Sequence, residues 1–550
     1  MSVIQTIKFY IITIYYLKLS QILWRIYYLI KPKFSVKIKN VEILKIKKLK
    51  NKFIIKSNSI KGKNSFLFLN ELREIKTDKA IDQIHLNKLW LYNLNYFDFL
   101  NSNLTIDQKN ITLIFLKRWL KEVKSINYVG LDPYPTSLRI VNWIKWYLSG
   151  NLVADDMKSS LVMQTEHLSK NIEWHLLGNH LLANAKALIF SGIVFDGQLS
   201  KQWKSKGIEI YKKQIDIQIL DDGGHFEKSP MYHAIILEDL LDLINIGKLF
   251  SNSLPKYFID KLIYKAEKML YWLEVMSYNN GENPHFNDST KNISSNIIEL
   301  KKYALKLKIL MPKNICTKEK IDFKELVESG FIRVDTENSR TFLDVGTIGA
   351  SYIPGHAHAD TLSFEASFFD QRFIVNSGIS TYEKSDRRSL ERSTYSHNTV
   401  EIDQKNSSDV WASFRVASRA DIIDLKKNKS KKSFCVSCSH DGYNSIFKKN
   451  IHQRQWSFSE KKLIITDSIT LNKSEAIARF ILHPDIKIKQ DGFKNMYSFT
   501  LENNIVKLHV EKGGSIISDM LYAPEFGILL KTKCISIKLV DGTSKVILTW

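Results

Sequence analysis

Apolar positions between residues 104 and 308 recur every three or four residues. The runs 234–244 and 259–273 both show this spacing, which is the period of a helix that buries one face. Clusters of Gly, Pro and Asp at residues 130–135 and 221–224 interrupt the pattern, and such clusters end helices of ordinary length. The pattern therefore predicts a domain of several helices.

In the C-terminal part of the chain the apolar period changes to two. Residues 362–368 and 506–510 alternate between apolar and polar side chains, which is typical of strands with one buried face. Two more alternating runs, residues 535–539 and 545–549, flank an Asp-Gly pair and predict a β-hairpin. We therefore expect antiparallel strands in stacked sheets.

Helices followed by strands, rather than alternating with them, predict an α+β multidomain chain. We place the boundary where the apolar period changes, near residue 325. The expected parts are an N-terminal segment at 1–103 that packs on the helical domain, the helical domain at 104–324, and an antiparallel β-sandwich at 325–550.

Residues 4–30 are rich in Ile, Leu, Tyr and Phe, which raises the question of a membrane span. The longest apolar run there, residues 9–17 with one Thr, has 9 residues, whereas a spanning helix needs roughly 20. No small-residue cleavage site follows, so we expect no transmembrane segment and no secretory signal, with the cytoplasm as the default location and the periplasm as the alternative. An amphipathic helix fits better, either packed on the protein or in peripheral contact with a membrane surface.

The chain of 550 residues carries 80 Lys and Arg against 57 Asp and Glu, a formal charge of +23. This excess favours an acidic partner, and nucleic acid, anionic lipid and acidic polysaccharide all qualify. The lysines are spread along the chain rather than interleaved with aromatic residues, so we expect no nucleic acid partner. A biased genome composition would produce the same excess.

The most specific polar cluster contains His356, His358 and Asp360. An extended chain points alternate residues to one face, so the three side chains would converge there. Such a group suits a metal site or a hydrogen-bonded acid/base group. The alternative is that the histidines cap a turn and bond to backbone groups.

Two further candidate groups lie at the starts of expected helices. Asn179 and His180 open one apolar run, and Tyr232 precedes another. Taken alone, an amide and an imidazole there are ordinary helix caps, and a tyrosine commonly packs with its hydroxyl in water.

Taken together, these segments resemble the heparinase II/III-like polysaccharide lyase family, which is related to alginate and oligoalginate lyases. The resemblance covers most of the chain, at residues 89–98, 132–143, 178–187, 222–233 and 355–419. It implies an incomplete (α/α) toroid followed by an antiparallel β-sandwich, with the site in the cleft between them. This agrees with the change from helical to strand periodicity.

The resemblance also implies the reaction, which is β-elimination in a uronic-acid-containing acidic glycan without a free cofactor. Donors held against the uronate carboxylate lower the barrier, while a base removes the C5 proton and an acid protonates the departing glycosidic oxygen. The implied catalytic residues are Asn179 and His180 as the carboxylate-neutralising pair, Tyr232 as acid and in some members also base, and His356 as the catalytic histidine of the second domain. Second-tier candidates for sugar contacts or orientation are Arg139, Glu227, His233 and His397.

Some members of this family bind a zinc ion in the β-domain, and His358 and His397 match two of its ligand positions. Asn376 stands where those members have an acidic ligand. An amide is a poorer zinc ligand than a carboxylate, so we expect an empty or weakly occupied site at His358, Asn376 and His397. Asp360 would have to turn toward His358 to supply the missing charge.

Two other functions remain open on the sequence. An inverting glycoside hydrolase would also use a helical toroid, with a carboxylate pair drawn from Asp221, Asp222, Glu227 or Glu238. A non-catalytic glycan-binding protein could act in the assembly of a surface polysaccharide. The sequence does not identify the glycan or its linkage.

Overall fold

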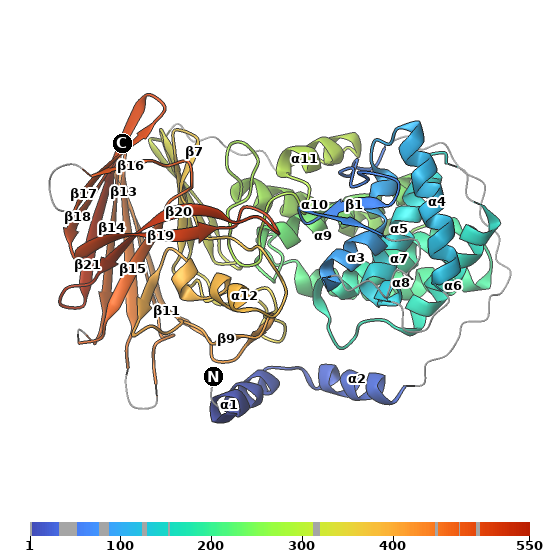
Figure 1. Cartoon of the computed structure of the whole chain (residues 1–550), viewed down its shortest axis with the longest axis horizontal. Coiled ribbons are helices and arrows are strands. Elements are labelled where there is room, and N and C mark those ends of the chain that lie inside the picture. The colour runs from blue at the N-terminus through green and yellow to red at the C-terminus, as the bar shows by residue number, and fades with distance from the viewer. Residues whose placement is uncertain are drawn as a thin grey trace.

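The computed structural model describes residues 3–31, 52–75, 87–123, 129–151, 154–311, 319–445, 449–471, 473–490 and 495–550. Figure 1 shows a helical body and a β-sheet body side by side, with two helices in line along one edge of the molecule. The helical body comes first in the chain and the sheets follow. The structure therefore confirms the predicted α+β order.

Helices of ordinary length build the helical body. They are α3 (Lys88–Tyr96), α4 (Ile106–Glu122), α5 (Pro133–Leu148), α6 (Asp155–Lys170), α7 (Gly178–Val194), α8 (Gln198–Gln218), α9 (Pro230–Leu249), α10 (Lys256–Val275) and α11 (Ile297–Lys306), with 3₁₀ turns η2 (Asp98–Asn101) and η3 (Val129–Leu131). Helix α7 is central, because every one of its residues except His180 is buried. The one partly exposed side chain on α7 is thus a predicted site residue.

One hydrophobic core holds this body together and begins earlier than residue 104. It extends from Phe53 to Phe342 and includes Phe66 and Trp90. Phe66 lies on a short hairpin made by β1 (Ser65–Phe68) and β2 (Glu71–Glu74). Much of the region before residue 104 is therefore part of the helical core rather than a layer on it.

The two N-terminal helices, α1 (Val3–Tyr15) and α2 (Leu19–Ile30), lie outside that core. Helix α1 packs Phe9 against Trp411 of the sheet body. Helix α2 contacts the helical body instead, where Trp24 stacks on Trp174. The expectation that the whole segment packs on the helical domain was therefore wrong for α1. None of the helices described is both long and apolar enough to span a membrane.

The strands of the sheet body pair in antiparallel fashion wherever the structure describes a strand pair. The strands are β3 (Ile321–Leu326), β4 (Phe331–Thr336), β5 (Ser339–Asp344), β6 (Phe364–Phe368), β7 (Gln371–Ile374), β8 (Val400–Ile402), β9 (Val410–Trp411), β10 (Arg415–Val416), β11 (Ile422–Lys429), β12 (Phe434–His440), β13 (His452–Ser459), β14 (Lys462–Ile469), β15 (Ala476–Ile481), β16 (Ile488–Gln490), β17 (Met496–Leu501), β18 (Asn504–Lys512), β19 (Gly514–Tyr522), β20 (Leu530–Lys538) and β21 (Thr543–Thr549). Between β7 and β8 lie the short helix α12 (Asp386–Glu391) and the turn η4 (Thr394–Ser396).

Three sheets share one core, as expected of a sandwich. Their strand orders are β3-β4-β5-β6-β7, β11-β12-β13-β14-β21-β18-β17-β16, and β19-β20-β15-β8. The shared core takes Phe364 from the first sheet, Trp456 from the second and Ile535 from the third. Alternation along β18 is as predicted, with Val506 and Leu508 buried.

Two predictions about individual strands were wrong. The runs 535–539 and 545–549 do not form a hairpin, because β20 pairs with β15 and β19 whereas β21 pairs with β14 and β18. The turn between them carries the chain from one sheet to another. Strand β6 is buried on both faces, because Glu365 accepts hydrogen bonds from Tyr278 and Arg372 on the side expected to face water.

Candidate active site

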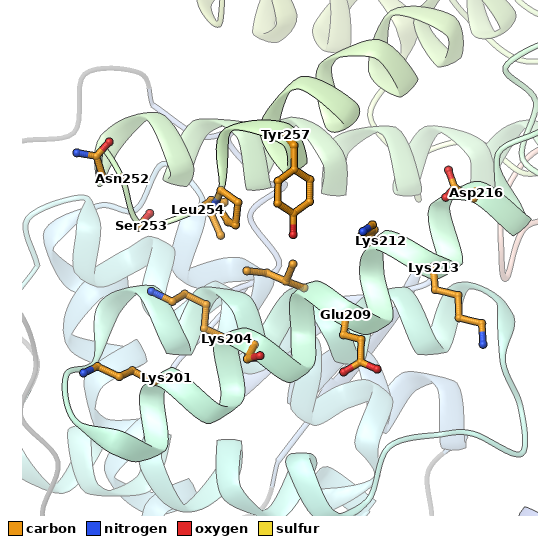
Figure 2. A pocket seen from close by; sticks show the side chains of 13 residues that line it. Lys201, Lys204, Glu209, Lys212, Lys213, Asp216, Asn252, Ser253, Leu254 and Tyr257 are labelled. Atoms are coloured by element: carbon orange, nitrogen blue, oxygen red, sulfur yellow. The ribbon is translucent and has the colours of Figure 1, made fainter.

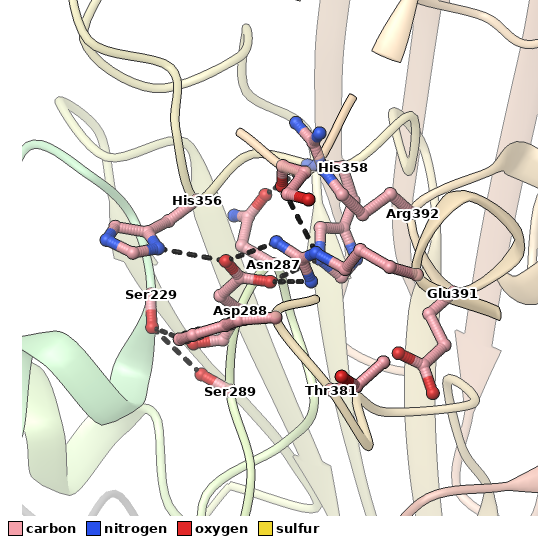
Figure 3. A network of polar contacts seen from close by, with 12 residues as sticks. Ser229, Asn287, Asp288, Ser289, His356, His358, Thr381, Glu391 and Arg392 are labelled. Atoms are coloured by element: carbon pink, nitrogen blue, oxygen red, sulfur yellow. Dashed lines mark hydrogen bonds and ion pairs between the residues drawn. The ribbon is translucent and has the colours of Figure 1, made fainter. Parts of the chain in front are cut away.

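The carboxylate of Asp288, in the segment between α10 and α11, is the hub of a buried polar network (Figure 3). Arg388 donates to both of its oxygens, at 2.6 and 2.7 Å. His356 Nδ1 lies 2.9 Å from Oδ2, and His358 Nε2 lies 2.9 Å from Oδ1. Burial opposes the charge of Asp288, but Arg388 and the imidazoles outweigh it, so its pKa is held well below the usual value. The two histidines thus converge on a carboxylate that was not among the predicted site residues.

The ring of His356 stacks on the ring of Tyr232, and this contact joins the two bodies of the protein. The ring centroids are 3.9 Å apart and the planes are inclined by 28°. Tyr232 lies in the first turn of α9, where the Ser229 side chain accepts from its backbone N–H. Because the buried phenol loses hydration, the pKa of Tyr232 is raised well above its usual value. The hydroxyl is therefore held in its protonated form, 3.2 Å from the hydroxyl of Tyr382.

Glu227 connects His356 to the start of α7. Its Oε1 accepts from the backbone N–H of Asn179 at 3.2 Å, and its Oε2 lies 3.7 Å from His356 Nε2. Burial raises the pKa of Glu227. Gly178 permits this approach, because a Cβ there would lie 2.5 Å from Glu227 Oε1 and the residue has a φ of +57°. Asn179, Glu227 and His356 are therefore brought together.

His180, next to Asn179, presents its ring at the same end of α7. Its Nδ1 lies 3.1 Å from Glu173 Oε1, and its ring contacts Tyr134 at 4.4 Å between centroids. Burial alone would lower the pKa of His180, but the adjacent carboxylate of Glu173 outweighs this and raises it. The carboxylate of Glu173 thus favours the cationic form of this imidazole.

A cavity of about 300 Å³ opens beside Tyr232. It is lined by residues of α3, α5, α7, α9 and the β1–β2 hairpin, and by Tyr382 and Phe526 of the sheet body. The tip of the hairpin is tied to the sheet body, since the Asn70 side chain donates to Glu525 Oε2 and to the backbone oxygen of Phe526. The cavity therefore lies between the two bodies, where the resemblance placed the site.

Three second-tier candidates are not placed to touch a sugar. Arg139 is fully buried in the helical core, where it donates to Gln164 and to the backbone oxygen of Asn95. His233 is equally buried, with Nδ1 accepting from the His225 N–H and Nε2 facing the backbone oxygen of Met269. His397 is also buried. This burial does not support their expected sugar contacts and leaves orientation of other groups as the remaining form of the prediction. Local sequence patterns do not tell which polar side chains point inward.

The residues of the expected weak zinc site do not fit the ion well. His358 Nδ1 and His397 Nε2 lie 3.2 Å apart, as a hydrogen-bonded pair does, and His358 Nε2 is already held by Asp288 Oδ1 at 2.9 Å. The oxygen of Asn376 already accepts from the backbone N–H of Asn398. Asp360 does not supply the missing charge, because it is directed to the Asn287 N–H instead. Within the described ranges, no cluster of three or more His, Cys, Asp or Glu side chains is arranged to hold a metal.

A larger cavity, of about 770 Å³, lies between α8 and α10, away from this chemistry (Figure 2). Lys201, Lys204 and Lys213 line it together with Asp216 and Tyr257. Two of the charged side chains that line this cavity, Asp216 and Lys212, are already engaged. Asp216 pairs with Lys261, and Lys212 lies over the ring of Tyr257. We assign the candidate site to the smaller cavity, because only that one reaches Tyr232.

Four site residues were missed by the sequence reasoning: Asp288, Arg388, Tyr382 and Glu173. The segment around Asp288, Asn-Pro-His-Phe-Asn-Asp-Ser-Thr at residues 283–290, has the same mixture of turn formers and polar groups as the clusters that were selected. That composition is a sequence signal by which Asp288 could be identified as a candidate site residue. No local signal distinguishes Arg388 or Tyr382, because their roles depend on contacts across the chain.

Comparison with known proteins agrees with this architecture. Residues 140–314 match the family model described as Heparinase II/III N-terminus, and residues 318–547 match the one described as Heparinase II/III-like, C-terminal. A heparin-sulfate lyase of Bacteroides stercoris is 28% identical over 247 residues, which are 42% of this chain and 36% of that protein. One from Bacteroides thetaiotaomicron is 26% identical over 351 residues, which are 53% and 48% of the two chains. The chain thus spans less than half the length of these curated relatives.

Solved structures show the same fold over more of the chain. A crystal structure of heparinase III has a TM-score of 0.65 at 18% identity and covers 87% of this chain and 79% of its own. That of a heparan sulfate lyase from Pedobacter heparinus has a TM-score of 0.56 at 17% identity, with 88% and 81% covered. The predicted toroid followed by a β-sandwich is confirmed at the level of the fold. With both family models matched in order across its two bodies, the chain belongs to the heparinase II/III-like family.

Proposed function

We propose that this protein is a polysaccharide lyase that cleaves a uronic-acid-containing acidic glycan by β-elimination. The observation that carries the proposal is the contact between Tyr232 and His356, 3.9 Å between ring centroids, beside the cavity between the two bodies. A protonated phenol and an imidazole in this arrangement supply the acid and the base that elimination needs.

The hydrogen bonds of His356 suit it to act as the base. The ionised carboxylate of Asp288 can only accept, so its contact with Nδ1 places the ring proton on Nδ1. In the neutral ring Nε2 then carries the lone pair that can take the C5 proton of the uronate, with Glu227 Oε2 3.7 Å away to stabilise the imidazolium that forms. Asp288 thereby acts as a positioning residue that fixes the tautomer, as a buried carboxylate does for other catalytic histidines.

Tyr232 is assigned the role of general acid. A tyrosine can serve as a base near neutral pH only if its anion is favoured, and here burial raises the pKa of Tyr232 instead. The protonated hydroxyl can donate to the glycosidic oxygen as the bond to C4 breaks. The C5 proton goes to His356, the electron pair forms the C4–C5 double bond, and the leaving oxygen takes the proton of Tyr232.

Asn179 and His180 are assigned to the uronate carboxylate. Removing the C5 proton puts a second negative charge toward that group, so donors that hold it lower the barrier. The amide of Asn179 is a neutral donor, and the carboxylate of Glu173 raises the pKa of His180 and so favours its cationic form. Both start the buried helix α7, whose N-terminus also favours a negative charge.

Two of the carboxylates considered for an inverting hydrolase, Glu238 and Asp222, are already engaged in other contacts. Glu238 is bound by Lys56 and Ser295. Asp222 accepts from the backbone and hydroxyl of Ser329. An inverting mechanism needs two carboxyl groups about 6.5–9.5 Å apart with room for a water between them, so these engaged side chains favour the lyase.

The substrate class follows from the same proposal. An excess of positive charge attracts an acidic polymer, and the formal charge here is +23. The curated relatives are named heparin-sulfate lyases, so heparan sulfate and heparin are the first polymers to test, beside other uronate polymers. We propose that no free cofactor takes part, because acid, base and carboxylate donors all come from side chains.

The test is the product. The full-length protein is incubated with a panel of uronate polymers, and the ultraviolet absorbance of the unsaturated uronate is followed together with new reducing ends. Both signals should rise together. New reducing ends without absorbance would identify a hydrolase, and binding without either signal would identify a non-catalytic glycan-binding protein.

A further inference from the structure

Helices α1 and α2 are apolar on two faces, and one face of each is used inside the molecule. On α1, Phe9 packs against Trp411 and Ala417, and the Trp411 indole donates to the Thr13 hydroxyl. On α2, Trp24 stacks on Trp174, and the Tyr28 hydroxyl donates to the backbone oxygen of Ile172. These contacts fix both helices against the two bodies, along one edge of the molecule (Figure 1).

The other face of each helix is apolar and exposed to solvent. Ten aliphatic side chains of the two helices are more than half exposed: Val3, Ile4, Ile7, Ile11, Ile14, Leu19, Leu23, Ile26, Leu29 and Ile30. The series 4, 7, 11 and 14 on α1 and 19, 23, 26 and 30 on α2 follow the helical period, so each forms a stripe along its helix. The docked residues Phe9 and Thr13 of α1 fall on the opposite side.

Exposed apolar stripes of this size indicate a surface that binds a partner. Single exposed apolar side chains are common on soluble proteins, whereas contiguous patches mark an interaction surface. The docked faces already hold the helices in place, so the exposed isoleucines and leucines are not needed for that purpose. What covers them must come from outside the described molecule.

The charge of this region indicates what the partner is. The first 41 residues contain seven Lys or Arg and no Asp or Glu. Further cations lie close by. Burial is the largest cause that lowers the pKa of Lys18, and the charge of Lys213 on α8 is the next. Burial and then the charge of Lys206 likewise lower the pKa of Lys31. The partner must therefore accept both an apolar surface and concentrated positive charge.

We propose that α1 and α2 lie in the surface of an anionic lipid bilayer. A helix with an apolar stripe and flanking lysines sinks that stripe to the headgroup boundary while its cations attract anionic lipids. The exposed Tyr15 and Tyr27 suit the interface, where an aromatic ring with a polar tip is favoured. Neither helix can span the bilayer, so the protein lies on one leaflet.

A second copy of this chain is a poorer partner for the same face. A symmetric dimer brings the same surface patch of both copies together. Here that would bring the cations of both copies, Lys8 among them, into one interface with no carboxylate on either helix, and like charges placed together across an interface are unfavourable. An anionic bilayer has no such penalty.

The test uses the full-length protein and sedimentation with vesicles of phosphatidylcholine, with or without phosphatidylglycerol. Wild type should sediment with the anionic vesicles, less with neutral ones, and less at high salt. The variant Ile7→Ser/Ile11→Ser/Leu23→Ser/Ile26→Ser should bind roughly tenfold more weakly or worse, because these exposed side chains supply the buried area. The matched control Ile505→Ser/Ile516→Ser removes exposed isoleucines from β18 and β19 and should bind as wild type.

A second variant guards against misfolding of the first. Lys8→Glu changes one exposed charge and should weaken binding to anionic vesicles only. The proposal is overturned if wild type does not bind anionic vesicles, or if the serine variant binds as wild type. It is also overturned if light scattering finds a wild-type dimer that the serine substitutions dissociate while no vesicle binding occurs, since the face would then belong to a second copy.

Discussion

The imidazole of His356 lies stacked on the phenol ring of Tyr232, with 3.9 Å between the centroids. Tyr232 comes from the first turn of α9 in the helical body, and His356 from the loop between β5 and β6 in the sheet body. Neither body alone holds both groups. The proposed acid and base are therefore a product of the contact between the two domains.

The proposed acid is tested by Tyr232→Phe, which removes one hydroxyl and keeps the ring that stacks on His356. We expect kcat to fall by about 10²–10⁴-fold, the usual loss when a general acid is removed, with unchanged thermal unfolding. Tyr257→Phe is the matched control, because Tyr257 is exposed on α10 far from the site. Near-native kcat in Tyr232→Phe on a polymer that wild type cleaves would rule out the role.

The positioning role of Asp288 is tested by Asp288→Asn. The substitution leaves Arg388 buried without its counter-charge, and breaking a buried pair in this way costs about 3–5 kcal/mol of unfolding free energy. We expect kcat to fall while KM changes little, since Asp288 orients His356 rather than contacting the substrate. A purely structural role would lower only the stability and the active fraction, so kcat per folded molecule separates the two. Asp485→Asn is the control, because it removes an exposed carboxylate beside His483.

The metal prediction is tested by Asn376→Asp. A carboxylate would supply the negative ligand that two neutral imidazoles lack, so the variant should bind zinc more tightly than wild type and should gain melting temperature when zinc is added. Elemental analysis of wild type purified without chelator should find little zinc, and chelation should leave activity unchanged. Stoichiometric zinc in wild type, with activity lost on its removal, would contradict us.

Buried histidines should make stability depend on pH in the acid range. The pKa of His233 is lowered from 6.5 to about 3, first by burial. Between these two values the unfolded chain binds a proton that the folded chain does not, so stability falls as the pH drops from about 6.5 toward 3, by up to about 1.4 kcal/mol per pH unit. His358, with a pKa of about 4, acts in the same direction. Asp360, whose pKa is raised to about 6, acts in the opposite one between pH 6 and 3.8.

The variant His233→Gln isolates one of these protons. Its unfolding free energy, measured by denaturant titration from pH 7 to pH 4, should fall less steeply with acidification than that of wild type. The variant can be less stable at every pH without affecting this test, since only the slope reports the proton. An unchanged slope would show that His233 is not the group responsible.

The sequence by itself determined the order of the two bodies, the helical runs that became α9 and α10, and the alternating strand β18. These follow from local spacing, because the side chains that share a face of one helix or strand are set by the period of that element. The site residues Asn179, His180, Tyr232 and His356 were implied by the family resemblance, because local spacing alone leaves an amide and an imidazole at a helix start as ordinary caps.

Only the tertiary structure decided which groups meet. Asp288 is 68 positions from His356, and Tyr232 is 150 positions from Tyr382. The same holds for the errors: β20 and β21 follow one another along the chain yet lie in different sheets, and His233 faces the core rather than the cavity. Periodicity specifies which residues share a face, but burial and the packing of distant segments determine what that face contacts.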